Sequence, residues 1–147
     1  MSDPAAIAGV YIDDVSVGYE LPVVVRNASR VQLFLYSAAT WNPHRIHYDV
    51  DYARFEGHPD VIVHGPLQGA WLSQYVTDWA GPRARLLNLS WQNRASALPE
   101  TDYEFHGRVV SVDGDTVMLE VWEQTADGSV LMPGEARVQL PSNATRT

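Results

Sequence analysis

The stretch TWNPHRIHYDVDYA, residues 40 to 53, is the part of the chain richest in reactive side chains. It contains two of the five histidines, His44 and His47, and also Asn42. Histidine titrates nearest to neutral pH, so His47 is a candidate general base or general acid. The amide of Asn42, five residues earlier, could reach across a turn to orient a water molecule or hold a carbonyl group. The alternative is a polar loop whose side chains bond only to the backbone.

His44 and His47 also permit a metal-site interpretation, because residues three apart can share one face of a helix. A third ligand would have to come from one of four residues: His58, His64, Asp49 or Asp51. The local sequence NPHRIHYD is not clearly helical, and it does not match the His-Glu-x-x-His motif of zinc enzymes. We therefore expect no metal.

A second candidate feature is the tripeptide His64-Gly65-Pro66, which stands where a helix is expected to begin. Glycine allows a ligand to approach the backbone closely, and unbonded N–H groups at a helix start can stabilise developing negative charge. Gly65 is therefore a candidate oxyanion hole, with His64 beside it as a supporting or substrate-binding residue. The same tripeptide also suits an ordinary Gly-Pro helix start.

Two tryptophans and two arginines complete the set of candidate binding residues. Trp41 lies inside the polar stretch, where its ring could line a pocket, and Trp71 could do the same from the following helix. Aromatic rings also fill hydrophobic cores, which is the alternative for Trp71. Arg83 and Arg94 could bind the phosphate of a phosphorylated carrier, or could lie on solvent-exposed strand ends.

Three helices are expected to position these residues. Ser29 is a suitable N-cap for a helix over residues 30–40, where apolar side chains recur at helical spacing. A short helix within residues 48–60 would be ended by a glycine and a proline. A longer helix over residues 66–80 is apolar nearly all round, so we expect it to be buried on more than one side.

Beyond residue 83 the hydrophobic pattern has a period of two, which indicates strands. Four strands are expected there, over residues 84–95, 102–113, 115–126 and 129–140, and residues 22–27 add another. Asp113-Gly114 and Asp127-Gly128 are typical of hairpin turns. An antiparallel meander would then wrap the buried helix in an α+β arrangement. The unpaired edges of such a sheet favour pairing with a second copy.

Length and composition limit the class of protein. The 147 residues suit a single domain over residues 1–147, with residues 1–10 and 141–147 as loose ends. A net charge of −8 disfavours nucleic-acid binding, which needs a positive surface. The lack of cysteine excludes a thiolate nucleophile and fits a reducing cytoplasm. We expect no signal peptide, and no apolar segment reaches the roughly 18 residues that a membrane span needs.

Several segments resemble the MaoC-like hydratases and dehydratases: YIDDVSVGYELP, YSAATWNPHRIHYDVDYA, VIVHGPLQGAWL and the closing strands. The resemblance covers about residues 11 to 140 and implies the hot-dog fold, an antiparallel sheet wrapped around one long central helix. It also implies addition or removal of water at the α,β double bond of an acyl thioester, on coenzyme A or acyl carrier protein. No metal or redox cofactor is implied, because coenzyme A or phosphopantetheine is part of the substrate.

The signature of this family is an aspartate followed five residues later by a histidine, both of which bind the catalytic water. His47 corresponds to the histidine and Asn42 to the aspartate, so the chain departs from the usual pattern. One branch, which resembles mesaconyl-CoA hydratases and yeast mitochondrial dehydratases, reads much like TxNxHRIHYD. Residues 74–82 resemble the small subunit of steroid side-chain enoyl-CoA hydratases, which works with a second hot-dog subunit. A homodimer or a hetero-oligomer is therefore expected.

The resemblance implies that His47 acts as general base, that Asn42 fixes the water, and that the Gly65 N–H polarises the thioester carbonyl. Two other functions stay open. Loss of the aspartate is compatible with a non-catalytic partner subunit of a heteromeric hydratase. A hot-dog thioesterase would need a carboxylate opposite the helix start, which Asp49 or Asp51 would have to supply.

Overall fold

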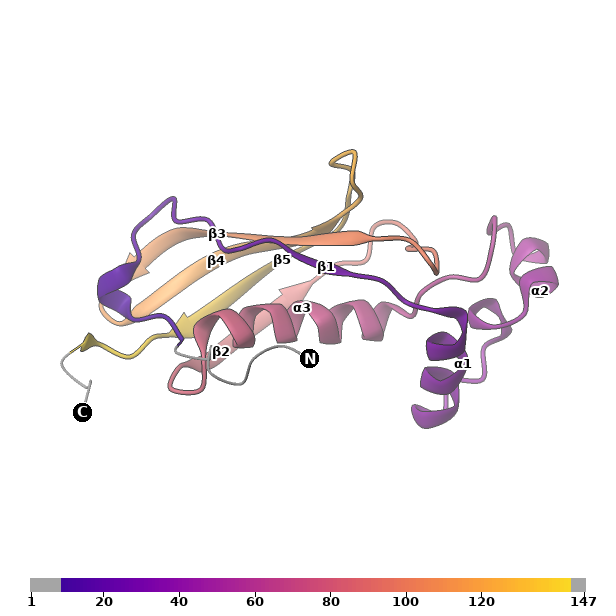
Figure 1. Ribbon diagram of the computed structural model, residues 1–147, viewed down its shortest axis with the longest axis horizontal. Coiled ribbons are helices and arrows are strands. Elements are labelled where there is room, and N and C mark those ends of the chain that lie inside the picture. The colour runs from indigo at the N-terminus through magenta and orange to yellow at the C-terminus, as the bar shows by residue number, and fades with distance from the viewer. Residues whose placement is uncertain (1–8, 144–147) are drawn as a thin grey trace.

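The residues with a period of two build one antiparallel sheet, along one face of which the long helix α3 (Gly65–Ala80) runs (Figure 1). The computed structural model describes residues 9–143. The strands are β1 (Val24–Arg26), β2 (Arg85–Trp91), β3 (Tyr103–Asp113), β4 (Thr116–Gln124) and β5 (Val130–Gln139). The expected α+β arrangement of one central helix against an antiparallel sheet is confirmed.

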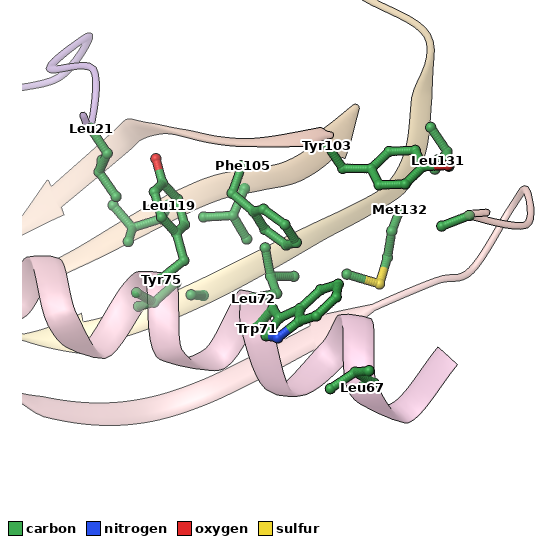
Figure 2. Close-up of a cluster of buried hydrophobic side chains, with 14 of the residues drawn as sticks. Leu21, Leu67, Trp71, Leu72, Tyr75, Tyr103, Phe105, Leu119, Leu131 and Met132 are labelled. Carbon is green, nitrogen blue, oxygen red and sulfur yellow. The ribbon is translucent and has the colours of Figure 1, made fainter. Parts of the chain in front are cut away.

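Helix α3 forms the centre of the hydrophobic core. Pro66 stands in its first turn, and the helix ends at Gly81, whose φ of 82° is in the left-handed region that glycine favours. Half of its residues are buried: Leu67, Gln68, Gly69, Trp71, Leu72, Tyr75, Val76 and Ala80. Figure 2 shows Trp71 and Tyr75 directed towards Phe105 on β3, with ring centroids 6.3 Å apart in both pairs. Each such side chain contributes roughly 1.5–3 kcal/mol by its burial.

The strand order is β1-β3-β4-β5-β2, which differs in one respect from the expected meander. The two predicted hairpins are confirmed, and Gly114 and Gly128 adopt φ values of 58° and 86° in their turns. Strand β2, however, pairs with β5 and not with β3. Because a short turn joins β2 to α3, the strand stays beside the helix. Residues 92–102 then connect β2 to β3, which lies next to β1 at the opposite edge of the sheet.

Two short helices and a single 3₁₀ turn lie beyond one end of the sheet (Figure 1). They are α1 (Arg30–Ala39), the 3₁₀ turn (Arg45–His47) and α2 (Val50–Phe55), and a further 3₁₀ turn (Ile12–Asp14) lies near the start of the chain. The expected N-cap is confirmed, since the Ser29 hydroxyl accepts a hydrogen bond of 3.1 Å from the Gln32 N–H. Asp49 caps α2 in the same way through the Tyr52 N–H.

The apolar residues of α1 that recur at helical spacing are exposed to solvent. Val31, Phe34 and Leu35 are 67%, 57% and 58% exposed, whereas Leu33 and Ser37 are the buried residues of this helix. We refer to Val31, Phe34 and Leu35 as the α1 stripe. A solvent-exposed apolar stripe of this kind commonly marks an interaction surface.

The ends of the described chain are attached to the fold. The Val10 N–H donates to the Ala80 carbonyl, and the Asn143 N–H donates to the Asp13 carboxylate at 2.7 Å. The rest of the expected loose ends, residues 1–8 and 144–147, lies outside the described residues. Within residues 9–143, no helix is both long enough and apolar enough to cross a membrane.

Candidate active site

His47 is buried at the end of the 3₁₀ turn, with 7% of its surface exposed. Its Nδ1 lies 2.8 Å from the carbonyl oxygen of Ile62. A carbonyl oxygen can only accept, so Nδ1 must carry the proton, and in the neutral ring Nε2 keeps its lone pair. Desolvation by burial lowers the pKa of His47, which also favours the neutral form. The residue is therefore held in the state that a general base needs.

His64 supports the His47 ring from behind. The two imidazoles are stacked, with centroids 3.7 Å apart and an interplanar angle of 19°. His64 is fully buried, and its Nε2 lies 2.8 Å from the Ser37 hydroxyl. Burial, followed by the neighbouring His47, lowers the pKa of His64 to about 4, so the ring is neutral at physiological pH. His64 thus contacts His47 and Ser37 and has no exposed surface.

Gly65 provides an unbonded donor at the start of α3. The next residue is Pro66, which has no N–H, and the N–H groups of Leu67 and Gln68 both donate to the His64 carbonyl. Among the described residues, none accepts a hydrogen bond from the Gly65 N–H. Because the positive end of the helix dipole lies here, this donor suits a developing oxyanion.

Asn42 lies in the turn that joins α1 to the 3₁₀ turn, and it is half-buried. Its side-chain oxygen accepts a hydrogen bond of 3.3 Å from the His44 N–H, which assigns the oxygen and leaves the amide NH₂ as a donor. No hydrogen bond links this amide to His47. A water molecule would be needed to connect the two side chains.

Contacts around Arg45 hold this loop in place. Its guanidinium forms an ion pair of 2.6 Å with Asp49 and lies 4.5 Å from the centre of the Tyr52 ring. The Arg45 guanidinium holds the pKa of Asp49 below its usual range, so this carboxylate is ionised and engaged. Tyr48 adds a hydrogen bond of 2.7 Å to the Pro43 carbonyl. The loop geometry that places His47 thus depends on polar contacts on its outer side.

The four other expected binding residues, besides His64, are not brought together in one copy of the chain. Trp41 is 89% exposed, and Trp71 is buried in the core between the helix and the sheet (Figure 2). Arg83 follows the C-terminal end of α3, about 24 Å along the helix from Gly65, and its guanidinium lies over the Tyr11 ring. Arg94 is exposed and donates to the Gln92 side chain at 3.2 Å.

Ser37 and the Ile62 carbonyl are parts of the site that the sequence does not indicate. Ser37 lies inside a helix, where a serine carries no distinctive signal, and a backbone carbonyl leaves no trace in residue identity. Within residues 9–143, no cluster of three or more histidine, aspartate or glutamate side chains could hold a metal ion. A surface groove of about 680 Å³ lies over β2, β4 and β5; Arg94 lines it, but Asn42, His47, His64 and Gly65 do not.

A family model for hydroxyacyl-thioester dehydratase type 2 matches residues 22–98, more than half of the chain. The match includes the turn that carries Asn42 and His47 and the whole of α3. The chain belongs to the hydroxyacyl-thioester dehydratase type 2 family. The expected relationship to the hydratases and dehydratases is thereby confirmed.

Two curated relatives agree with the resemblances seen in the sequence. Mesaconyl-C(4)-CoA hydratase of Chloroflexus aurantiacus is 54% identical over 109 residues, which cover 74% of this chain and 36% of that protein. The 3-oxo-4,17-pregnadiene-20-carboxyl-CoA hydratase beta subunit of Mycobacterium tuberculosis is 26% identical over 105 residues, or 71% of this chain and 81% of that subunit. This member of the dehydratase family therefore spans about a third of the length of the first relative.

The solved structures confirm the hot-dog fold. The unliganded (R)-hydratase of Pseudomonas aeruginosa superposes with a TM-score of 0.81 at 20% identity, over 92% of this chain and 88% of that one. At this level of identity the likeness establishes the architecture of the dehydratase chain and not its substrate.

Proposed function

We propose that this chain catalyses the reversible addition of water to the α,β double bond of an enoyl thioester. The observation that carries the proposal is the geometry of His47, whose Nδ1 is bound by the Ile62 carbonyl while its ring stacks on His64 at the start of α3. This geometry leaves a neutral base beside an unbonded backbone donor. Family membership supports the same reaction.

In hydration, His47 Nε2 removes a proton from water as the water oxygen forms a bond to the β-carbon. The π electrons of the double bond move towards the thioester carbonyl, whose oxygen gains negative charge. The Gly65 N–H donates to that oxygen and stabilises the enolate. Protonated His47 then delivers its proton to the α-carbon, which regenerates the base and gives the 3-hydroxyacyl thioester. Dehydration follows the same path in reverse.

Asn42 has a narrower role in this scheme than an aspartate would have. An amide cannot take up or release a proton at physiological pH, so His47 must handle both proton transfers. The free NH₂ of Asn42 can donate to the oxygen of the attacking water and fix its position. The aspartate of the family signature is therefore replaced by a positioning residue, and the chain stays catalytic.

The substrate class is an acyl thioester of coenzyme A or acyl carrier protein. The printed name of the C. aurantiacus relative specifies a CoA thioester, which supports this choice. The proposal assigns no metal or redox cofactor, because the base and the oxyanion donor are both supplied by the chain. The cytoplasmic location expected from the sequence stays a prediction.

We further propose that the working unit contains a second hot-dog subunit, either a copy of this chain or a related chain. The outer edge of β2 is unpaired among the described residues, and the α1 stripe is exposed. The M. tuberculosis relative is itself named as a beta subunit. A second subunit would cover both features at once.

Substitution of His47 tests the catalytic assignment. In the assembled protein, His47→Ala is expected to lower kcat for hydration of crotonyl-CoA at least 100-fold, which is the usual contribution of a general base. His44→Ala is the matched control, because His44 lies three residues away, is exposed and pairs with Glu56. Full activity in His47→Ala, or an equal loss in both variants, would overturn the assignment.

Two other functions have less support: a non-catalytic partner subunit and a thioesterase. A non-catalytic partner subunit has no need of a buried base with a fixed tautomer, and reconstitution with a His47→Ala chain separates the two cases. A thioesterase would need a free carboxylate opposite the helix start. Asp49 is engaged with Arg45 and with the start of α2, which leaves Asp51, exposed in the first turn of α2, as the remaining candidate. Release of free coenzyme A would be the sign of thioesterase activity.

A further inference from the structure

A buried carboxylate lies under α3, away from His47. Glu123 on the inner face of β4 is 0% exposed, and its Oε2 accepts a hydrogen bond of 2.6 Å from the Gln68 side chain. Its other oxygen, Oε1, is buried and has no partner among the described residues. The residues paired with Glu123 across the sheet are Phe105 and Met132, which carry no charge. Burial of a carboxyl group in such surroundings costs free energy unless the group is hydrogen-bonded.

The hydrogen bond from Gln68 is the first of a chain that ends at the protein surface. Gln68 Oε1 accepts from Asn93 Nδ2 at 3.4 Å, and the same nitrogen lies 3.5 Å from the sulfur of Met132. Because Glu123 Oε2 accepts, Gln68 must present its NH₂ to the carboxylate and its oxygen to Asn93. The orientation of the Asn93 amide is thus fixed from inside the core. Its Oδ1 is left as an acceptor without a partner among the described residues.

Asn93 lies directly against the start of α3. A Cβ placed on Gly65 would be 3.0 Å from Asn93 Oδ1, 3.3 Å from Cγ and 3.4 Å from Nδ2. Gly65 does not have a positive φ, so its backbone conformation alone does not demand glycine. The absence of a side chain at position 65 makes room for the Asn93 amide. Asn93 is an exposed residue, and its acceptor Oδ1 therefore lies close to Gly65, whose N–H is the proposed oxyanion donor.

We propose that Asn93 is a further substrate-binding residue, positioned by Glu123 through Gln68, and that its Oδ1 accepts a hydrogen bond from the first amide N–H of the pantetheine arm. The inference rests on the proposed function. Asn93 Oδ1 would repel the thioester oxygen that the Gly65 N–H binds, because both oxygens carry partial negative charge. Its partner on the substrate must therefore be a hydrogen-bond donor. The donor closest to the thioester is the amide N–H, which two methylene groups separate from the sulfur. Coenzyme A and acyl carrier protein share this group.

The contact is tested with two small probes that differ only in the donor. One is butyryl-N-acetylcysteamine, and the other carries an ester oxygen in place of the amide N–H. Neither has a double bond, so binding to the assembled protein can be measured by calorimetry without turnover. Wild type is expected to bind the amide probe about 3- to 10-fold more tightly, as one net hydrogen bond predicts. Asn93→Ala should bring the ratio of the two affinities, amide probe over ester probe, to about one. Asn88 is also exposed, and Asn88→Ala should preserve the ratio.

Two substitutions at Glu123 test the positioning role. Glu123→Gln keeps an acceptor oxygen for Gln68 and should keep the preference for the amide probe. Glu123→Leu removes the acceptor, releases the orientation of both amides and should lower the ratio towards one. Thermal unfolding checks that each variant is folded. If Glu123→Leu is not folded, the result for Asn93→Ala decides the test. A wild-type ratio of one, or a ratio unchanged in Asn93→Ala, would overturn the proposal.

Parallel assays separate this inference from the proposed function and identify the carrier. Hydration of crotonyl-CoA and of crotonyl-acyl carrier protein is measured in wild type and Asn93→Ala. Asn93→Ala should lower kcat/KM for whichever substrate the wild type uses, because both contain the amide. If Asn93→Ala lowered kcat/KM for crotonyl-CoA but left the ratio of probe affinities unchanged, that result would place the contact on the nucleotide of coenzyme A and refute our assignment. If wild type prefers the amide probe yet hydrates neither substrate, the proposed function fails and the Asn93 contact stands.

Discussion

Glu123→Gln is expected to remove a specific dependence of folding stability on pH. Burial raises the pKa of Glu123 from its ordinary value of 4.5 to about 7, although the hydrogen bond from Gln68 acts in the opposite direction. The folded chain therefore holds this proton more tightly than the unfolded chain. The resulting stabilisation is complete below pH 4.5 and is lost as the pH rises to about 7. It amounts to roughly 3 kcal/mol of unfolding free energy.

The assay is urea unfolding of wild type and Glu123→Gln between pH 5 and pH 8. The quantity of interest is the difference between their unfolding free energies at each pH. His47 and His64 have lowered pKa values, so they oppose Glu123 by adding stability as the pH rises, but both proteins contain them and their effect cancels. A fixed protein concentration removes any contribution from subunit association.

The unfolding free energy of wild type, relative to that of Glu123→Gln, should fall by about 2–3 kcal/mol between pH 5 and pH 8. Glu120→Gln is the matched control, since Glu120 lies on the same strand but is exposed and paired with Arg108. Its difference from wild type should show no such slope. If the curves of wild type and Glu123→Gln ran parallel over this range, the buried carboxyl would not be raised in pKa, and the reasoning would be refuted.

Hydration activity should fall on the acid side with an apparent pKa below 6.5, because burial lowers the pKa of His47, and a midpoint above 6.5 would contradict this. Gly69→Ala should lower the unfolding free energy by about 1–3 kcal/mol, since its Cβ would lie 2.3 Å from the Trp91 ring, and an unchanged urea midpoint would be the contrary result. Phe34→Asp on the α1 stripe should reduce the associated mass in sedimentation analysis, while His58→Asp, away from the stripe, should not.

Local patterns predicted most of the fold. The Ser29 cap, the two Asp-Gly hairpins and the apolar helix that follows Pro66 are determined by residues close together in the sequence, and each was confirmed. The position of β2 was not predictable in this way. It depends on which sheet edge lies nearest to the end of α3, and that is a property of the assembled core.

The same distinction, between local patterns and contacts across the fold, applies to the candidate site. His47 and Gly65 were predicted because histidine chemistry and glycine geometry can be recognised from residue identity. The Ile62 carbonyl and Asn93 were missed, since their roles come from contacts across the fold. The exposure of the α1 stripe was also missed, because helical spacing shows that a helix has an apolar face but not what covers it.

The bond from His47 to the Ile62 carbonyl bears on how this site could evolve. In many enzymes a carboxylate side chain orients the catalytic histidine, so losing the carboxylate disables the base. Here the orienting group belongs to the main chain, and every substitution at position 62 retains it. The tautomer of the base therefore does not depend on which side chain stands at position 62. Because no carboxylate orients His47, an asparagine at position 42 leaves the tautomer of the base unchanged.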